Sequence, residues 1–362
     1  MEYRLEELFD LQMGKTPSRN VAEYWENDDN KWISIADLSK CGKYIYDTKE
    51  CLSDSAIIES GIKQIPANTV VMSFKLSIGK TAITSEPMYS NEAIMSFRDK
   101  KLVELLPEYI YYLLLSKNWD DGANKAVMGK TLNKTTLSKV RVNIHSVQEQ
   151  QEIVCVLNQA AALIEIHQQQ LQKLDELVKA RFVEMFGDPI LNQKHFPVYR
   201  MDEIVEFQGG SQPDKKFFEY VPTDENIRLI QIRDYKTDRF ITYIPRTMAK
   251  RFCTADDIMI GRYGPPIFQI LQGIEGSFNV ALMKATPKTG NREFVRQFLK
   301  QDCLLEYLEG MSKRTAGQDG IQMDKLKVYP FPLPPIELQN QFATFVKGID
   351  KSKLLNFFFY PI

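Results

Sequence analysis

Residues 3–14 have the sequence YRLEELFDLQMG, and residues 199–210 have the sequence YRMDEIVEFQGG. The charged, apolar and glycine positions agree along the whole stretch. Each copy is then followed by a proline, Pro17 in the first and Pro213 in the second. A repeat of this length inside one chain indicates two related domains that share one architecture.

Further matched blocks follow in the same order. Residues 32–37 (WISIAD) correspond to residues 229–234 (LIQIRD), and residues 137–153 run parallel to residues 326–342. Several blocks in a conserved order make chance similarity a poor explanation. From periodicity, each repeat is predicted to mix short helices and short strands. In the first repeat we expect helices at 5–11 and 108–115, and strands at 32–35, 69–74, 80–84 and 140–144.

A long helix is the clearest single element of the sequence. Residues 147–185 contain neither proline nor glycine. Of the ten positions spaced alternately by four and three between Ile153 and Met185, eight are apolar and the other two are His167 and Arg181. This heptad pattern predicts a helix of about 60 Å that needs a partner helix. Ser146 can cap its start, and the sequence GDP at 187–189 stops it. The run from Ile336 has the same phase, which favours an antiparallel or crossed helix pair.

The predicted fold class is therefore α+β, with two pseudo-repeated globular domains separated by a pair of long coiled-coil-like spacer helices. After Lys353 the heptad charges give way to aromatic residues, so the second helix looks shortened. On that basis we expect residues 171–185 of the first helix to lack part of their apolar partner surface.

The composition excludes several classes of protein. The chain has 362 residues, of which 44% are hydrophobic and 26% charged, and its formal net charge is −1. These values exclude a disordered tail, a collagen-like chain and a broadly basic nucleic-acid coat. Five cysteines without a Cys-x-x-Cys pair indicate neither a disulfide scaffold nor a zinc ribbon. The start of the chain shows no signal region, and the longest apolar run is far short of about 20 residues. We expect a cytoplasmic protein without a membrane segment.

No catalytic centre is evident in the sequence. Gly-Lys-Thr occurs at 14–16, 79–81 and 129–131, but each copy lacks the earlier glycine of a phosphate-binding loop. The sequence YGPPI at 263–267 lacks the amide or carboxylate and the aromatic residue of an adenine methyltransferase motif. The three histidines lie outside any metal-ligand spacing. We predict no catalytic residue, no metal ligand and no cofactor.

Local positive charge is the remaining functional signal. Residues 124–141 hold five basic residues and no acidic one. Arginine and lysine suit guanine edges and phosphates, whereas asparagine and glutamine suit adenine edges. The candidate recognition loops are 14–19, 75–80, 124–134, 231–235, 261–265 and 313–320. The candidate DNA-binding residues are Lys15, Thr16, Ser18, Arg19, Lys75, Lys80, Lys125, Lys130, Asn133, Arg233, Arg262, Tyr263, Lys313, Arg314 and Gln318. Ordinary solvated loop side chains are the alternative interpretation.

Taken in order, these motifs resemble the DNA-specificity subunit of type I restriction-modification systems. Residues 5–17 and 32–37 look like the start of a target recognition domain, and 68–71 and 78–80 with Asn91 look like its middle. Residues 147–153 look like the entry to a spacer helix. The sequence ARFVEMFGDP at 180–189 is similar to the exit of that helix and is the most specific piece.

The resemblance implies a subunit that recognises DNA without catalysis. Residues 1–145 and 188–335 would be target recognition domains 1 and 2, each recognising one half of a bipartite site on double-stranded DNA. Residues 146–187 and 336–362 would be spacer helices that set the gap. The implied partners are two modification (adenine methyltransferase) subunits on the spacer, joined by restriction (endonuclease and translocase) subunits. Partner subunits could also supply much of the phosphate-neutralising charge.

Two other functions stay open at this point. One is a coiled-coil scaffold that binds protein rather than nucleic acid. The basic stretch 124–141, which contains no acidic residue, weighs against it. A DNA-modifying enzyme that binds S-adenosylmethionine is the other, and the missing cofactor motifs weigh against it.

Overall fold

The computed structural model describes residues 1–26, 28–75, 77–119, 124–126, 129–263, 267–312 and 321–359. The chain forms two compact units, Met1–Glu165 (unit 1) and Ile166–Ile362 (unit 2). Each unit has its own hydrophobic core and is described by itself.

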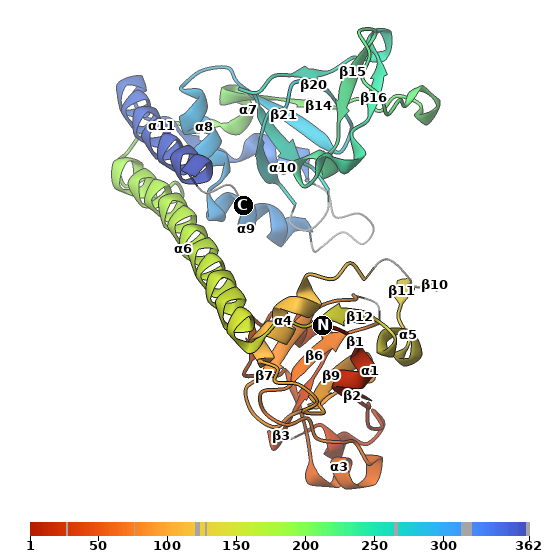
Figure 1. The fold of residues 1–362 in the computed structure, drawn as a ribbon. Coiled ribbons are helices and arrows are strands. Elements are labelled where there is room, and N and C mark those ends of the chain that lie inside the picture. The colour runs from red at the N-terminus through yellow and green to blue at the C-terminus, as the bar shows by residue number, and fades with distance from the viewer. Residues whose placement is uncertain are drawn as a thin grey trace. The chain divides into compact units, whose positions relative to one another are not determined.

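Unit 1 alternates short strands and short helices before the long helix α6 begins (Figure 1). Its elements in chain order are β1 (Glu2–Arg4), α1 (Leu5–Leu8), β2 (Phe9–Met13), η1 (Ala22–Tyr24), β3 (Asn30–Ile33), α2 (Ile35–Leu38), β4 (Tyr44–Ile45), β5 (Glu50–Leu52), α3 (Asp54–Ser60), β6 (Val70–Ser73), β7 (Thr81–Thr84), β8 (Tyr89–Ser90), β9 (Ile94–Asp99), α4 (Pro107–Leu115), β10 (Asn124–Ala126), β11 (Gly129–Thr131), α5 (Lys134–Ser138), β12 (Arg141–Asn143) and α6 (Val147–Phe186).

Two main sheets form the body of unit 1. The larger sheet has the strand order β2-β9-β6-β7-β4, and the smaller has the order β5-β3-β8 with β3 parallel to β8. Every residue of β6 and β7 is buried, because other elements cover both faces of these central strands. The first and last strands, β1 and β12, pair with each other, so the beginning of the unit is fastened to the segment that enters α6.

Unit 2 contains a similar succession of elements, although helix α9 stands where unit 1 has the hairpin β10–β11. In chain order they are β13 (Val198–Arg200), α7 (Met201–Ile204), β14 (Val205–Gly209), η2 (Lys215–Phe217), β15 (Asn226–Ile230), η3 (Ile232–Tyr235), η4 (Asp238–Phe240), β16 (Tyr243–Pro245), η5 (Arg246–Met248), β17 (Phe252–Cys253), β18 (Ile258–Gly261), β19 (Gln269–Gln272), β20 (Gly276–Phe278), β21 (Leu282–Pro287), α8 (Arg292–Leu299), α9 (Asp302–Ser312), α10 (Met323–Val328), β22 (Pro330–Pro332) and α11 (Ile336–Phe359).

The sheets of unit 2 repeat those of unit 1. The order β14-β21-β18-β19 corresponds to β2-β9-β6-β7, and β16-β15-β20 corresponds to β5-β3-β8 with the same parallel pair in the middle. Both units also open with the same capping box, in which the N–H of Arg4 or Arg200 donates to Glu7 or Glu203. The predicted α+β fold with two pseudo-repeated domains is thereby confirmed.

One predicted helix is shorter than expected. We expected a helix over 5–11, but α1 ends at Leu8 and the chain continues as strand β2. The apolar pattern of this stretch fits a helix and a strand equally well, because Phe9 and Leu11 also alternate with the exposed Asp10. Pairing of β2 with β9 buries Phe9 and Leu11 in the core, and this tertiary contact decides the outcome.

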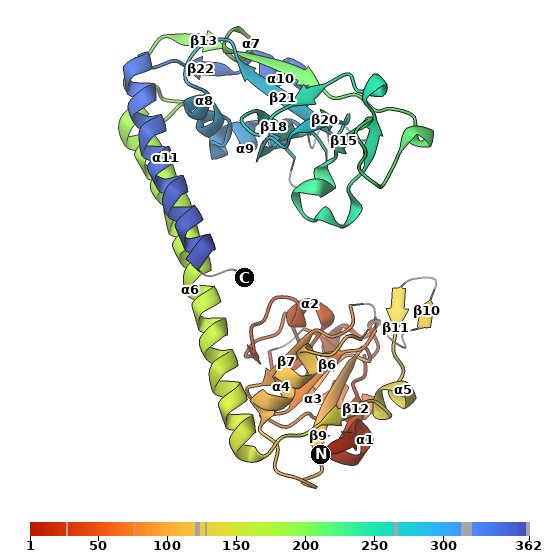
Figure 2. The same cartoon turned by 45° about the horizontal axis from the view of Figure 1, so that its top comes forward.

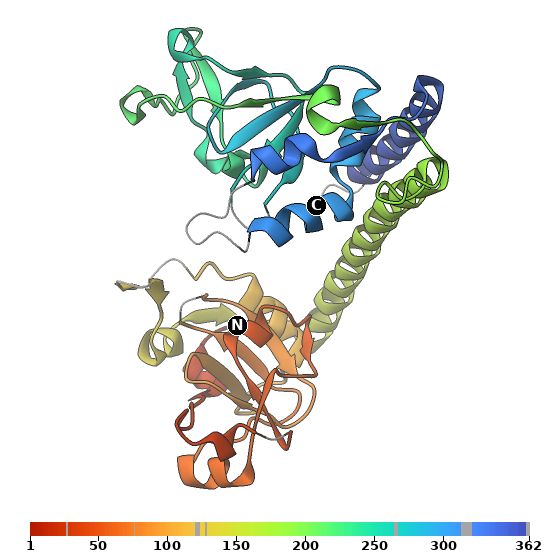
Figure 3. The ribbon, with the colours of Figure 1, turned by 180° about the vertical axis from the view of Figure 1, so that it is seen from behind.

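The long helix is confirmed almost residue for residue. Helix α6 begins at Val147 and ends at Phe186 without interruption (Figure 3). The N–H of Glu149 donates to Ser146 Oγ at 3.4 Å, which is the predicted cap, and the N–H of Ser146 donates in return to the Glu149 carboxylate at 2.8 Å. At the other end, Gly187 has a φ of +76° and its N–H donates to the carbonyl of Val183.

Within unit 2, α11 runs antiparallel to the last part of α6 (Figure 2). Phe182 of α6 and Phe342 of α11 are both buried, with ring centroids 5.5 Å apart. Towards the other end of the pair, Lys353 Nζ lies 2.5 Å from Asp175 Oδ1. The pairing of the two long helices is therefore antiparallel, which was one of the two predicted arrangements.

The part of the apolar face of α6 that lacks a covering helix is not the part that we expected. We predicted that residues 171–185 would lack part of their apolar partner surface, but Val178 and Phe182 are buried in the core of unit 2. The reason is the antiparallel direction, which places the beginning of α11 against the end of α6. Exposed residues at the heptad positions lie earlier on α6, where Leu157 is 37% and Ile164 is 39% exposed.

Candidate nucleic-acid interface

One end of the large sheet of unit 1 brings together several predicted recognition loops. The N–H of Lys15 donates to the carbonyl of Ser90, and the N–H of Phe74 donates to that of Ala93. The segments that follow β2 and β6 are thus both bound to the connection between β8 and β9. We call this end of the sheet, with the segments 14–19, 74–75 and 90–93, the recognition edge of unit 1.

Charged side chains converge on Glu92 at this recognition edge. Burial opposes ionisation of Glu92, but the hydrogen bond from the Thr16 hydroxyl and the positive charges of Lys75 and Arg19 lower its pKa below the usual range. Three of the predicted residues, Thr16, Arg19 and Lys75, therefore lie around Glu92, although Lys75 is far from the other two in the sequence.

The other lysines of these loops contact backbone or hydroxyl oxygens of their own unit. Lys15 Nζ donates to the carbonyl of Ser60, and Lys80 Nζ donates to Ser39 Oγ. Ser18 is exposed, and its carbonyl accepts a hydrogen bond from Trp25. These contacts are to neutral oxygens, which a phosphate oxygen can replace.

The basic segment that includes residues 124–134 joins the same edge. The N–H of Leu132 donates to the carbonyl of Phe74 at 3.0 Å. Asn133 caps helix α5, since its side-chain oxygen accepts the N–H of Thr136 at 2.7 Å. The side-chain oxygen of Asn133 therefore already accepts a hydrogen bond within unit 1. Lys125 and Lys130 belong to β10 and β11, and their side chains lie outside the described part of the chain.

Unit 2 builds a recognition edge in the same way. The N–H of Ser211 donates to the carbonyl of Phe278, and the N–H of Arg262 donates to that of Ala281 at 2.9 Å. The guanidinium carbon of Arg262 lies 5.3 Å from the ring of Tyr263. Unit 2 thus presents an arginine and a tyrosine where unit 1 presents Phe74 and Lys75.

Arg233 lies on the neighbouring turn η3. Ile232 of this turn packs against Gly261, which places η3 beside the end of β18. Arg233 donates to Thr242 Oγ1 at 3.1 Å, and its guanidinium carbon is 5.8 Å from the exposed ring of Phe240. The predicted residues Lys313, Arg314 and Gln318 lie outside the described residues.

Sequence reasoning missed the side chains that hold Arg19. Its guanidinium forms two hydrogen bonds with Glu50 and lies over the ring of Trp25. Hydrogen bonding to Arg19 is the main reason why the pKa of Glu50 is below its usual range. No pattern in the sequence links residues 19 and 50. The sequence feature that could have indicated these contacts of Arg19 is the pair of tryptophans, Trp25 and Trp32.

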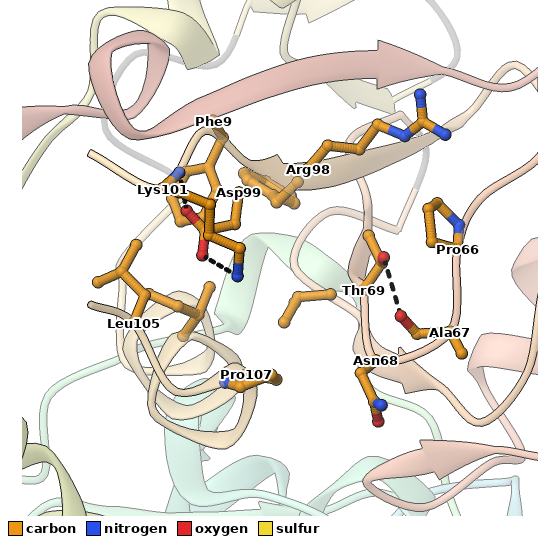
Figure 4. A pocket seen from close by; sticks show the side chains of 13 residues that line it. Phe9, Pro66, Ala67, Asn68, Thr69, Arg98, Asp99, Lys101, Leu105 and Pro107 are labelled. Carbon is orange, nitrogen blue, oxygen red and sulfur yellow. Dashed lines mark hydrogen bonds and ion pairs between the residues drawn. The ribbon is translucent and has the colours of Figure 1, made fainter. Parts of the chain in front are cut away.

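A separate pocket of about 330 Å³ lies at the opposite end of the same sheet (Figure 4). It lies where β6 begins and β9 ends, beside Asn68, Asp99 and Lys101. Lys101 Nζ is 3.0 Å from Asp99 Oδ2, so these two charges at its rim neutralise each other. The lining includes none of the predicted DNA-binding residues, and the pocket is therefore distinct from the recognition edge.

Among the residues that the structure describes, no group of three or more histidine, cysteine, aspartate or glutamate residues is arranged to hold a metal ion. In the same part of the chain, no helix is both long and apolar enough to cross a membrane.

The fold is that of the specificity subunits of type I restriction-modification systems. The structure of such an S subunit from M. genitalium superposes on the chain with a TM-score of 0.52 and 13% sequence identity. The superposition covers 98% of this chain and 90% of the other, so it includes both units.

Sequence comparison agrees with the fold. Residues 1–176, just under half of the chain, match the family model described as the type I restriction modification DNA specificity domain. It is 27% identical over 233 residues to the MjaIX specificity subunit of Methanocaldococcus jannaschii, which covers 59% of this chain and 53% of that one. It is 28% identical over 195 residues to the EcoR124I/EcoR124II specificity subunit of Escherichia coli, covering 52% and 44%. The chain thus spans about half the length of these curated relatives.

Proposed function

We propose that the chain is the DNA-sequence-recognition subunit of a type I restriction-modification complex and has no catalytic role of its own. Residues 1–145 and 188–335 are target recognition domains 1 and 2, and each recognises one half of a bipartite site. Residues 146–187 and 336–362 are the spacer helices that set the gap between the two halves.

One observation carries this proposal. Both units place a basic side chain at the same end of the same sheet, on segments bound to equivalent connections. In unit 1 these segments hold Lys15, Arg19 and Lys75, and in unit 2 they hold Arg262. A repeated module with a repeated basic edge suits two half-sites, because side-chain differences at the edge can change the bases recognised without changing the fold.

The exposed apolar residues of α6 support a second part of the proposal. Val156, Leu157, Leu163 and Ile164 all lie exposed on the first half of the helix. Helical surfaces of this kind mark protein interaction sites. In the proposed complex this surface docks the adenine methyltransferase subunits, two per chain, and restriction subunits join them.

Methylation mapping tests the proposal directly. The chain is expressed together with its methyltransferase subunit in a host without other modification systems, and methylated adenines are mapped across the genome. The expected result is one motif made of two short specified halves with an unspecified gap of constant length. A continuous motif, or methylation without sequence preference, contradicts the proposal.

A binding experiment separates the proposal from the scaffold alternative. The assembled complex should bind a duplex with the mapped motif far more tightly than a scrambled duplex, and affinity should fall as salt rises. A scaffold would bind its protein partners without any DNA affinity at low salt. Calorimetry of the chain alone with S-adenosylmethionine tests the enzyme alternative, and a lack of binding would exclude it.

A further inference from the structure

Arg19 lies on a platform made of two tryptophan side chains. The rings of Trp25 and Trp32 meet edge to face with centroids 5.0 Å apart. The guanidinium carbon of Arg19 is 3.6 Å from the centre of the Trp25 ring and 5.1 Å from that of Trp32. A guanidinium stacked on indole faces is held by cation–π attraction and samples few orientations.

The same two tryptophans also fix the backbone next to Arg19. Trp25 Nε1 donates to the carbonyl of Ser18 at 3.1 Å, and Trp32 Nε1 donates to the carbonyl of Lys15 at 3.1 Å. Trp32 is only 3% exposed, so one of the two indoles belongs to the core. The segment 15–19 is therefore attached to the body of unit 1 at two points.

Glu50 occupies the hydrogen-bonding side of the guanidinium. Arg19 Nη1 lies 2.6 Å from Glu50 Oε1, and Arg19 Nη2 lies 3.0 Å from Glu50 Oε2. The two side chains are 48% and 35% exposed, so a competing acceptor can reach the pair. A carboxylate presents two acceptors side by side, as do two phosphate oxygens and the O6 and N7 atoms of guanine.

We propose that Glu50 is a specificity-determining residue that acts as an internal acceptor for Arg19 until DNA offers two acceptors in the same geometry. This inference rests on the proposed function. DNA replaces Glu50 on the guanidinium, while Trp25 and Trp32 keep Arg19 in position. Non-cognate DNA must separate the ion pair and also bring phosphates near the Glu50 carboxylate, so it gains little from Arg19.

Unit 2 lacks this arrangement at the corresponding positions. Counting five residues from the equivalent glycines Gly14 and Gly210, Lys215 takes the place of Arg19. By strand register Leu229 takes the place of Trp32, since Leu229 pairs with Ser277 of β20 as Trp32 pairs with Tyr89 of β8. Lysine cannot offer two parallel donors in one plane, and leucine has no indole N–H. The proposed control of recognition therefore belongs to the first half-site.

The decisive variant is Glu50→Gln in the full chain, assembled with its methyltransferase subunits. Glu86→Gln is the matched control, because Glu86 forms an ion pair with Lys31 at 2.6 Å in the same unit and the substitution removes the same charge. Affinities are measured by fluorescence anisotropy at several salt concentrations, with the mapped duplex and with a scrambled duplex.

The expected result is a loss of discrimination in Glu50→Gln alone. Binding of the scrambled duplex should tighten by about fivefold at low salt, and its logarithmic salt slope should steepen by about one, as for one additional phosphate contact. The mapped duplex should change much less, and Glu86→Gln should match the wild type in the ratio of the two affinities. An unchanged ratio in Glu50→Gln, or equal changes in both variants, overturns the inference.

A second set of measurements identifies the acceptor on the DNA. Arg19→Lys keeps the charge and removes the two-donor geometry. If a guanine is the acceptor, Arg19→Lys should lose the same affinity as replacement of that one guanine by 7-deazaguanine. If a phosphate is the acceptor, no guanine replacement should matter and Arg19→Ala should reduce the salt slope by about one. Both results support the inference, and indifference to every change at Arg19 overturns it.

The outcomes also separate this inference from the proposed function. Wild-type complex that binds mapped and scrambled duplexes equally contradicts the proposed function itself. Wild-type complex that discriminates, together with a Glu50→Gln variant that discriminates equally well, contradicts only the role of Glu50.

Discussion

At the scale of single residues, a buried glutamine occupies the same position in both units. Gln150 Oε1 accepts the N–H of Leu106 at 3.0 Å, and Gln339 Oε1 accepts the N–H of Asn291 at 2.7 Å. Leu106 and Asn291 are the residues that precede helices α4 and α8. Each glutamine therefore ties the start of a long helix to the start of a helix of the globular body.

Gln150→Ala should destabilise unit 1. The substitution removes the hydrogen-bond partner of the Leu106 N–H and of the Glu104 carbonyl, both in part-buried bonds, at a cost of about 2 kcal/mol in the free energy of unfolding. Chemical denaturation of the full chain measures the effect. Gln148→Ala, at an exposed position of the same helix, is the control and should change the unfolding free energy little. Equal effects of both substitutions would contradict the role assigned to Gln150.

Two glycines at the recognition edges are required by close packing. A Cβ atom on Gly14 would overlap the carbonyl oxygen of Ser90, and one on Gly210 would overlap that of Asn279. Gly14→Ala should therefore lower the stability of unit 1 by about 3 kcal/mol. Gly42→Ala, where an added Cβ meets no atom within 4 Å, is the control. Thermal unfolding compares the two, and a Gly14→Ala variant as stable as the control would contradict the observed packing.

At the scale of elements, an aromatic cluster joins the end of α6 to α11 and α8. Phe182 and Phe186 lie one helical turn apart on α6 and pack against Phe294 and Phe342, with ring centroids between 4.8 and 5.7 Å apart. This explains why the helix exit at 180–189 is the most specific piece of the sequence. Its two phenylalanines are core residues of unit 2.

Phe182→Ala should cost unit 2 about 3 to 5 kcal/mol, since it removes a fully buried ring and leaves a cavity. Val183→Ala on the exposed side of the same helix is the control, because Val183 is 51% exposed. Denaturation of both variants and of the double variant Phe182→Ala with Phe342→Ala should reveal a coupling of about 1 kcal/mol between the rings. Strict additivity would show that the two rings do not support each other.

The exposed face of α6 gives a prediction about assembly. Leu163→Glu should leave the fold intact, because Leu163 is already 46% exposed, but it should prevent co-purification of the methyltransferase subunit. Gln168→Glu adds the same charge at an exposed position of the same helix and should leave co-purification unchanged. Retention of the partner by Leu163→Glu would place the docking surface elsewhere.

At the scale of the whole molecule, the repeat predicts modular recognition. Arg19 belongs to the recognition edge of unit 1 and Arg262 to that of unit 2. Arg19→Ala should therefore relax the preferred bases in one half of the methylated motif, and Arg262→Ala should relax those in the other half. Each lost base contact is worth about 1 to 3 kcal/mol of discrimination. Methylation mapping with each variant checks this, and a variant that relaxes both halves equally would contradict the assignment of one half-site to each unit.

The sequence by itself determined the repeat, the α+β class and the limits of α6. These features depend on local signals, namely the order of matched blocks, the heptad spacing, the cap at Ser146 and the stop at Gly187. Such signals act over a few residues and can be recognised without knowing what lies nearby. The candidate loops followed from local charge, and the structure brings Thr16, Arg19 and Lys75 together at one edge of unit 1.

Only the tertiary structure decided where α1 ends, which part of α6 is covered and which side chain holds Arg19. The strand β2 exists because β9 lies beside it, and the covered end of α6 follows from the antiparallel direction of α11. Glu50 meets Arg19 because strand β5 pairs with β3. In each case the free energy comes from contacts between residues distant in the chain, and no local pattern encodes such contacts.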